Sequence, residues 1–167
     1  AADGVTMPAT ERGQDRRLAR SAARLAAVQA LYQMEITGAP LATVRREFED
    51  HRLGASLDGA QYREADLDLF RDILGGVVEH QAEIDRLTDR ALVERWPLGR
   101  VDPTLRAVFR AAGHEISARS DIPARVTIGE YVDVTKAFFG EGEEARFVNA
   151  VLDQMARTAR PGELGPR

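Results

Sequence analysis

Five arginines lie close together near the start of this chain, and their spacing could support recognition of a phosphate backbone. They are Arg12, Arg16, Arg17, Arg20 and Arg24. Arg16, Arg20 and Arg24 recur every four residues, so on a helix they would share one face. Guanidinium groups bind phosphate oxygens through paired hydrogen bonds and also stack on exposed bases, which suits single-stranded RNA. The row therefore predicts an RNA-binding helix, although a row of this kind also occurs as an ordinary solvated helix face.

Aromatic side chains offer a second kind of contact. Phe138, Phe139 and Phe147 are concentrated around a glycine-rich connection near the C-terminus. Rings in such a place could stack on bases, a contact worth roughly 1 to 3 kcal/mol each. Packing in the core is the alternative interpretation for each of the three.

No catalytic or metal-binding pattern accompanies the arginines. The chain has no cysteine, which excludes disulfides, thiolate metal sites and cysteine nucleophiles. Its histidines form no H-E-x-x-H pair, no serine lies in a nucleophile elbow, and the glycine pairs lack the spacing of a phosphate-binding loop. The acids Glu141, Glu143 and Glu144 are more typical of a solvated loop than of a cation site. We therefore expect no enzyme, no cofactor and no metal.

Composition places the chain among ordinary folded domains. It has 167 residues, of which 44% are hydrophobic and 30% charged, and its formal net charge is -4. This length supports one domain with one core. The negative net charge argues against a general polyanion binder, so the local row of arginines must carry any RNA affinity. No apolar run is long enough for a signal peptide or a membrane span, which favours the cytoplasm.

Apolar residues recur at helical spacing almost everywhere, and alternating runs typical of strands are missing, so we expect an all-α fold. The expected helices span residues 15–34, 41–49, 64–80, 81–94, 103–119, 124–138 and 144–157. Asp102 followed by Pro103 is a typical helix start. Gly75 and Gly76 interrupt an apolar stripe and could bring two helices close together. About seven helices joined by short loops predict a compact bundle.

The ends of the chain differ from the rest. Residues 1–11 show no apolar periodicity, and residues 158–167 contain repeated glycine and proline. We expect both segments to be disordered tails that flank one helical domain at 12–157.

Four stretches resemble the NusB family. The segment 16–32, ending in Ala27-Val28-Gln29-Ala30-Leu31-Tyr32, is similar to the arginine-rich first helix of that family. Segments 96–110 and 122–132, and then Phe147-Val148-Asn149-Ala150-Val151-Leu152-Asp153, look like its C-terminal half in the same order. The resemblance covers most of residues 12–157, although 41–95 matches mainly in pattern. It implies two packed three-helix groups plus an extra helix.

The resemblance also implies a function. NusB proteins bind the boxA element of leader RNA together with a small-subunit ribosomal protein that serves as NusE. The complex joins NusA, NusG and RNA polymerase and suppresses premature termination. A homodimer of the free protein is a further possibility that the sequence leaves open.

Candidate site residues follow from the arginine row and the resemblance together. The expected RNA-binding residues are Arg16, Arg17, Arg20, Arg24, Tyr32, Glu143 and Phe147. The expected NusE-binding residues, on the helix from Pro103 and the connection before it, are Trp96, Arg100, Leu105 and Arg106. Leu105 stands where many relatives have an acid, and Gly129 where many have asparagine, so partner contacts at these two positions are open.

Two alternative functions remain at this point. A NusB-like domain also forms the N-terminal part of certain ribosomal-RNA cytosine methyltransferases, but the chain ends before a cofactor-binding α/β domain could begin. A helical dimerisation module or an rRNA-associated module without antitermination activity is the other alternative. The arginine row distinguishes an RNA-binding protein from a dimerisation module, because a dimer scaffold does not require such a row.

Overall fold

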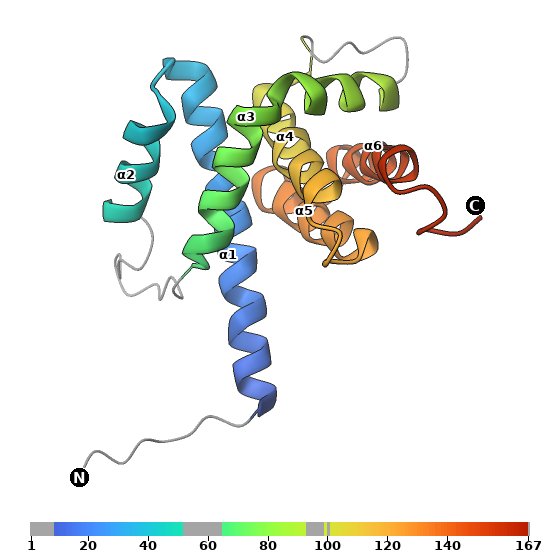
Figure 1. The fold of residues 1–167 in the computed structure, drawn as a ribbon, viewed down its shortest axis with the longest axis horizontal. Coiled ribbons are helices and arrows are strands. Elements are labelled where there is room, and N and C mark those ends of the chain that lie inside the picture. Colours follow the sequence, from blue (N-terminus) through green and yellow to red (C-terminus); the bar gives the residue numbers. More distant parts are fainter. Residues whose placement is uncertain (1–8, 52–64, 93–98, 100, 167) are drawn as a thin grey trace.

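The computed structural model describes residues 9–51, 65–92, 99 and 101–166, which fold into α-helices and contain no strand (Figure 1). The helices are α1 (Ala9–Thr37), α2 (Leu41–His51), α3 (Leu67–Ala91), α4 (Pro103–Ala118), α5 (Ala124–Phe139) and α6 (Glu143–Ala159). The prediction of an all-α fold is confirmed.

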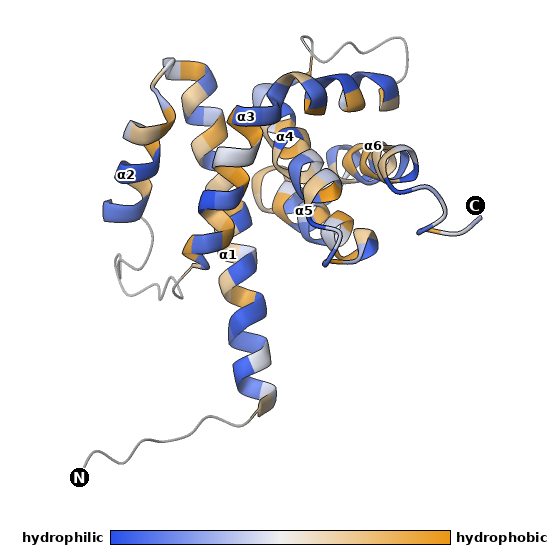
Figure 2. Cartoon of the chain, viewed as in Figure 1, coloured by the Kyte–Doolittle hydropathy of each residue, from blue (hydrophilic) through white to orange (hydrophobic). Residues whose placement is uncertain are grey.

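The helices form two neighbouring groups around a shared core. α1 packs on α2 and α3, whereas α5 and α6 pack on each other and on α4. Contacts of α4 with α1 and α3 join the two groups. One cluster of buried side chains runs through all six of these helices, and hydrophobic residues face inward between α1, α3 and α4 (Figure 2). The central part of α1 is thus surrounded, while its ends reach the surface.

The expected count of about seven helices is slightly wrong, because the segments 64–80 and 81–94 are one helix. α3 runs through both and bends at His80, whose φ of -118° and ψ of 20° are not helical. The bend turns the second part of α3 across the end of α4 (Figure 1). Neither proline nor a capping residue stands at the bend, so nothing in the sequence stops the helix there.

Capping explains where two helices begin. The carboxylate of Asp102 accepts a hydrogen bond from the Thr104 backbone N–H at 2.8 Å, and Pro103 occupies the first turn, which confirms the expected start of α4. Asp66 caps α3 in the same way through the N–H of Leu69 at 2.9 Å. Both helix starts therefore rest on side-chain acceptors that the sequence supplies.

The glycine pair in α3 has the expected packing role at one of its two positions. A Cβ atom on Gly76 would lie 2.0 Å from the imidazole ring of His114 in α4, whereas a Cβ on Gly75 would meet nothing. His114 in turn places its Nε2 atom 3.0 Å from Asp72 Oδ2 in α3. The close approach of α3 and α4 therefore depends on Gly76.

The first and last helices extend further toward the ends of the chain than expected. α1 already begins at Ala9, and residues 1–8 lie outside the described part. α6 extends to Ala159, and Arg160 then donates to the carbonyl oxygens of Ile116 and Ile122, each at 2.9 Å. The C-terminal segment thus contacts the end of α4 and the connection after it, and the expectation of a disordered tail from residue 158 stays a prediction.

Candidate nucleic-acid interface

The first turns of α1 project from the body of the protein and carry three of the predicted arginines (Figure 1). We call residues 9–22 the arginine arm; every one of them is exposed or half-buried. Arg16 and Arg17 are exposed and Arg20 is half-buried. Hydrophilic residues dominate these turns in Figure 2. Within the described part of the chain, none of the three arginines forms an ion pair, so their guanidinium donors face solvent.

Arg24 does not belong to this exposed row, and its prediction as an RNA-binding residue is corrected here. Its side chain is 2% exposed, because α1 passes between α3, α4 and α5 at this point. Ala23 and Ala27 beside it are completely buried. A spacing of four residues aligns side chains on a helix, but it does not show where other helices cover that helix.

Arg24 lies in a buried ionic cluster that joins three helices. Its Nε and Nη2 atoms donate to the two carboxylate oxygens of Glu115 in α4, at 2.9 Å and 3.0 Å. The hydroxyl of Tyr131 in α5 donates to the same carboxylate. Glu130 Oε2 lies 3.6 Å from Arg24 Nη1 and accepts a hydrogen bond from the Ser21 hydroxyl at 2.8 Å. These five residues are the Arg24 cluster.

The electrostatics of the cluster keep Arg24 and Tyr131 protonated. Burial opposes the charge of Arg24, but the hydrogen bonds and the charge of Glu115, with Tyr131 and Glu130, raise the pKa of Arg24 above its usual value. Burial, followed by the charge of Glu115, raises the pKa of Tyr131 well above its usual value. The tyrosine therefore stays protonated and remains a donor to Glu115.

The sequence missed the other members of the Arg24 cluster, although one signal was present. Glu115 stands directly before Ile116 within an apolar stripe of α4, where an acid is rarely buried without a cationic partner. The run of alanines around Arg24 is the matching signal on α1, since small side chains allow helices to approach. Tyr131 and Glu130 carry no comparable sign in the sequence.

Tyr32 lies at the other end of α1, beside a groove rather than beside the arm. It is 39% exposed, Ile36 is 56% exposed and Phe138 of α5 is 38% exposed. A cavity of about 300 Å³ opens between them, lined by Gln29, Tyr32, Gln33, Ile36, Thr37, Thr104 and Phe138. Because Tyr32 is twelve residues after Arg20, the two lie roughly 18 Å apart along the helix axis. The structure does not bring Tyr32 and the arginines into direct contact.

Phe147 and Glu143 come from α6, which packs on α3, α4 and α5. Phe147 is half-buried and meets Phe109 of α4 edge-on, with 5.8 Å between ring centroids. Glu143 is exposed on the first turn of α6. Phe147 therefore packs against Phe109 on one side and is only partly exposed. Neither Phe147 nor Glu143 lies against the arginine arm.

Of the four expected partner-binding residues, two lie in the part of the chain that the structure describes. Trp96 and Arg100 lie outside the described residues. Leu105 is 8% exposed and belongs to the core, so little of its side chain is available to a partner. Arg106 donates from Nε to Glu35 of α1 at 2.8 Å and from Nη1 to the Val101 carbonyl at 2.8 Å.

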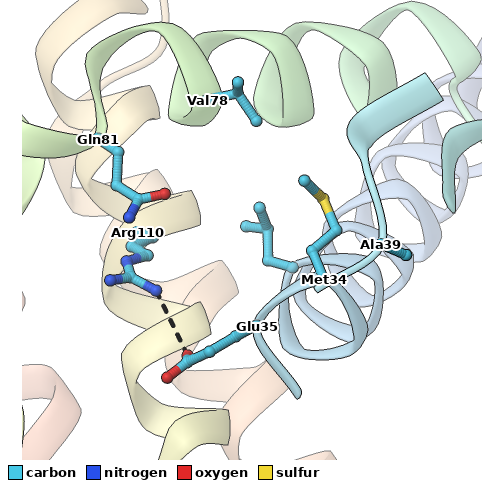
Figure 3. Close-up of a pocket in the computed structure, with 7 residues that line it drawn as sticks. Met34, Glu35, Ala39, Val78, Gln81 and Arg110 are labelled. Atoms are coloured by element: carbon cyan, nitrogen blue, oxygen red, sulfur yellow. Dashed lines mark hydrogen bonds and ion pairs between the residues drawn. The ribbon is translucent and has the colours of Figure 1, made fainter. Parts of the chain in front are cut away.

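A second cavity of about 300 Å³ lies next to this ion pair, between α1, α3 and α4 (Figure 3). Leu31, Met34 and Val78 give it apolar walls. Arg110 borders it and donates to Glu35 at 3.3 Å and to Asp85 at 3.0 Å. Arg110 and Glu35, two of the charged groups at this cavity, are therefore already paired with each other.

Two other kinds of site are absent from the described residues. No group of three or more histidine, cysteine, aspartate or glutamate side chains there could hold a metal ion. No described helix is both long and apolar enough to cross a membrane.

Comparison with known proteins places these features in a family. The model of the NusB family matches residues 21–157. A transcription antitermination protein NusB of Nitrobacter hamburgensis is 56% identical over 145 residues, which are 87% of this chain and 90% of the relative. The protein of the same name from Rhodopseudomonas palustris is 53% identical over 153 residues, or 92% of this chain and 90% of the relative.

Solved structures give the same result for the fold. NusB of T. maritima matches with a TM-score of 0.66 and 29% identity, over 89% of this chain and 94% of that one. A structure described as antitermination factors NusB and NusE in complex with dsRNA matches with a TM-score of 0.67 and 22% identity. That match covers 84% of this chain and 97% of the other.

Proposed function

Because this chain belongs to the NusB family, we propose that it is a transcription antitermination factor that binds boxA-type single-stranded leader RNA together with NusE. In this proposal the RNA-bound pair joins NusA, NusG and RNA polymerase in the cytoplasm and suppresses premature termination. The chain acts by binding and carries out no catalysis.

The arginine arm is the observation that carries the RNA-binding part of the proposal. Arg16, Arg17 and Arg20 lie on exposed turns and are not paired with acids of the described chain. The protein has a net charge of -4, so nonspecific attraction of a polyanion is weak and a local cationic surface has to supply it. Guanidinium groups on a projecting helix can reach phosphates without rearrangement of the core.

The groove at the end of α1 supports a place for the protein partner. Tyr32, Ile36 and Phe138 expose apolar area, and Thr104 on the first turn of α4 borders the same cavity. Exposed apolar surface with a polar rim is typical of protein-binding sites. We assign NusE to this groove, next to the α4 start that the family resemblance indicates. In this proposal Tyr32, which the sequence analysis assigned to RNA binding, contacts NusE instead.

A thermodynamic cycle tests the proposal. Isothermal titration would measure this protein with NusE, with boxA RNA, and with each after saturation by the other. Linkage requires both couplings to be equal, and roughly 5- to 150-fold tighter binding is the typical range. RNA of scrambled sequence and a boxA duplex serve as electrostatic controls. If each ligand bound equally well with and without the other, or if scrambled RNA coupled to NusE as strongly as boxA RNA, the antitermination proposal would be wrong and only the description of the fold would stand.

A matched pair of variants separates the two surfaces. Ile36→Asp in the groove should weaken NusE binding and leave binding of RNA alone unchanged, whereas Arg16→Ala should do the reverse. Sedimentation of the free protein at increasing concentration tests the alternative occupant of the groove, a second copy of this chain. A dimer that Ile36→Asp dissociates, with no NusE binding by either form, would favour the dimerisation module instead.

A further inference from the structure

In the part of the chain that the structure describes, other helices cover little of the arginine arm. Ala23 and Arg24 are the first buried residues of α1, and each described residue before them is exposed or half-buried. The contacts at the base of the arm include the Asp66 N–H donating to the Ala19 carbonyl at 3.0 Å and, within the Arg24 cluster, the Ser21 hydroxyl donating to Glu130. The Arg24 cluster follows within one helical turn.

The geometry of the Arg24 cluster is better suited to setting the orientation of α1 than to increasing the free energy of unfolding. A buried ion pair is often no more stabilising than apolar side chains of the same size, because both charges lose water. A bidentate pair between a planar guanidinium and a carboxylate is strict in geometry, however, and here both bonds are made, at 2.9 Å and 3.0 Å. Arg24 therefore fixes how α1 is rotated and tilted relative to α4, and Tyr131 fixes the same carboxylate to α5.

We propose that Arg24 and Glu115 are positioning residues for RNA binding, which set the direction of the arginine arm without touching RNA. This inference rests on the proposed role of the arm in binding RNA. Arg16 lies eight residues before Arg24, roughly 12 Å along the helix axis. A tilt of α1 by about 20° at Arg24 would therefore move the arm's backbone at Arg16 by about 4 Å. Such a shift exceeds the length of a hydrogen bond and would break phosphate contacts.

The first experiment replaces the pair by apolar side chains. Arg24→Met with Glu115→Leu removes one positive and one negative charge, so the net charge and its long-range attraction for RNA are unchanged. Arg110→Met with Asp85→Leu is the matched control, because that pair is also bidentate and joins α3 to α4 away from the arm. We expect the first double variant to bind boxA RNA at least about 5-fold more weakly and the control to bind normally.

A double-mutant cycle shows whether the weaker binding acts through the arm. The Arg24→Met, Glu115→Leu change is repeated in a protein that already carries Arg16→Ala, Arg17→Ala and Arg20→Ala. A positioning pair has no further effect in that background, whereas an independent structural defect lowers RNA affinity by the same factor in both backgrounds.

Distance measurement gives a readout that does not involve RNA. The chain has no cysteine, so spin labels can be attached specifically at Gln14→Cys in the arm and Asp133→Cys on α5, both exposed positions. We expect a narrow distance distribution in the otherwise unchanged protein. The Arg24→Met, Glu115→Leu variant should broaden or shift it, and the Arg110→Met, Asp85→Leu control should not.

The outcomes separate this inference from the function on which it rests. If the arm's triple alanine variant binds RNA normally, the proposed function fails. If that variant binds RNA measurably more weakly but Arg24→Met with Glu115→Leu binds normally, or weakens binding equally in both backgrounds, the positioning role is wrong. An unchanged label distance also overturns it. If the double variant does not fold, Tyr131→Phe removes only one donor to Glu115 and is measured in its place, with the same three criteria.

Discussion

Arg20 and Arg24 are neighbours one turn apart on the same helix, yet they occupy opposite environments. Arg20 is half-buried on the arm and unpaired within the described chain, whereas Arg24 is 2% exposed and bonded to both oxygens of Glu115. The guanidinium of Arg20 is available to a ligand, whereas that of Arg24 is bonded to Glu115 within the core. The comparison shows that a row of arginines can change its role within a single turn, at the point where other helices surround α1.

The largest effect on the free energy of unfolding should come from replacing Arg24, the buried one of these two arginines. Arg24→Ala leaves the carboxylate of Glu115 buried without its cation, so the free energy of unfolding should fall by roughly 3 to 5 kcal/mol. Arg20→Ala on the half-buried arm should change it by about 0.5 kcal/mol or less. Urea denaturation measures both. Similar decreases for the two variants would mean that the environments are not as different as the structure indicates.

The phenylalanine pair between α4 and α6 extends the comparison to apolar residues. Phe109 is fully buried and Phe147 is half-buried at the edge of the same contact. Phe109→Ala should lower the free energy of unfolding by roughly 3 to 5 kcal/mol, because it opens a cavity. Phe147→Ala should lower it clearly less. Thermal melts compare the two, and a larger decrease for Phe147 would contradict the packing described.

Tyr131→Phe should have a moderate effect at neutral pH, a decrease in the free energy of unfolding of roughly 1 kcal/mol for one hydrogen bond. It should also change the alkaline limit of stability. Because the pKa of Tyr131 is raised in the folded protein, the unfolded chain releases this proton first, and stability falls as pH rises beyond about 10. Unfolding curves measured between neutral and alkaline pH should show a shallower alkaline decline in Tyr131→Phe. An identical decline in both proteins would show that this hydroxyl is not responsible.

The smallest effect should lie in the C-terminal segment. The Ala124 backbone N–H donates to Glu163 at 2.8 Å and, together with Arg160, lowers the pKa of that carboxyl. A lowered pKa contributes stability above the unfolded value, and the contribution is lost as pH falls from about 4 through the folded value. Glu163→Gln should therefore slightly reduce the acid dependence of unfolding. A variant with an unchanged acid transition would show that the segment after α6 is not held by this contact.

The sequence predicted the fold better than the site, and particular residues show why. Periodicity and capping are local, so the all-α class, the start of α4 after Asp102 and the close approach at Gly76 were all predictable. Whether α3 ends or bends at His80 depends on packing against α4, and no local residue reports it. The expected number of helices was therefore slightly too high.

The site was predictable only as far as side chains could be assigned to exposed turns. Arg16, Arg17 and Arg20 lie where the sequence places them, on one projecting helix. Arg24 has the right spacing but is covered by helices distant in sequence. Leu105, which the resemblance rather than its spacing assigns to the partner surface, belongs to the core. The acid that pairs with Arg24 is 91 residues away along the chain, so no local pattern could connect them.

The central claim is that the arm's arginines contact phosphates, and the salt dependence of RNA binding tests it most directly. Affinity for a short boxA RNA would be measured from low to moderate salt for the unchanged protein, for the triple alanine variant at Arg16, Arg17 and Arg20, and for the control Arg110→Met with Asp85→Leu. Removing one arginine–phosphate interaction with single-stranded RNA should reduce the slope of log affinity against log salt by roughly 0.7, hence about 2 for the triple variant. Arg110→Met with Asp85→Leu should keep the original slope. A triple variant with an unchanged slope would contradict the account, because the arm would then be an ordinary solvated helix end.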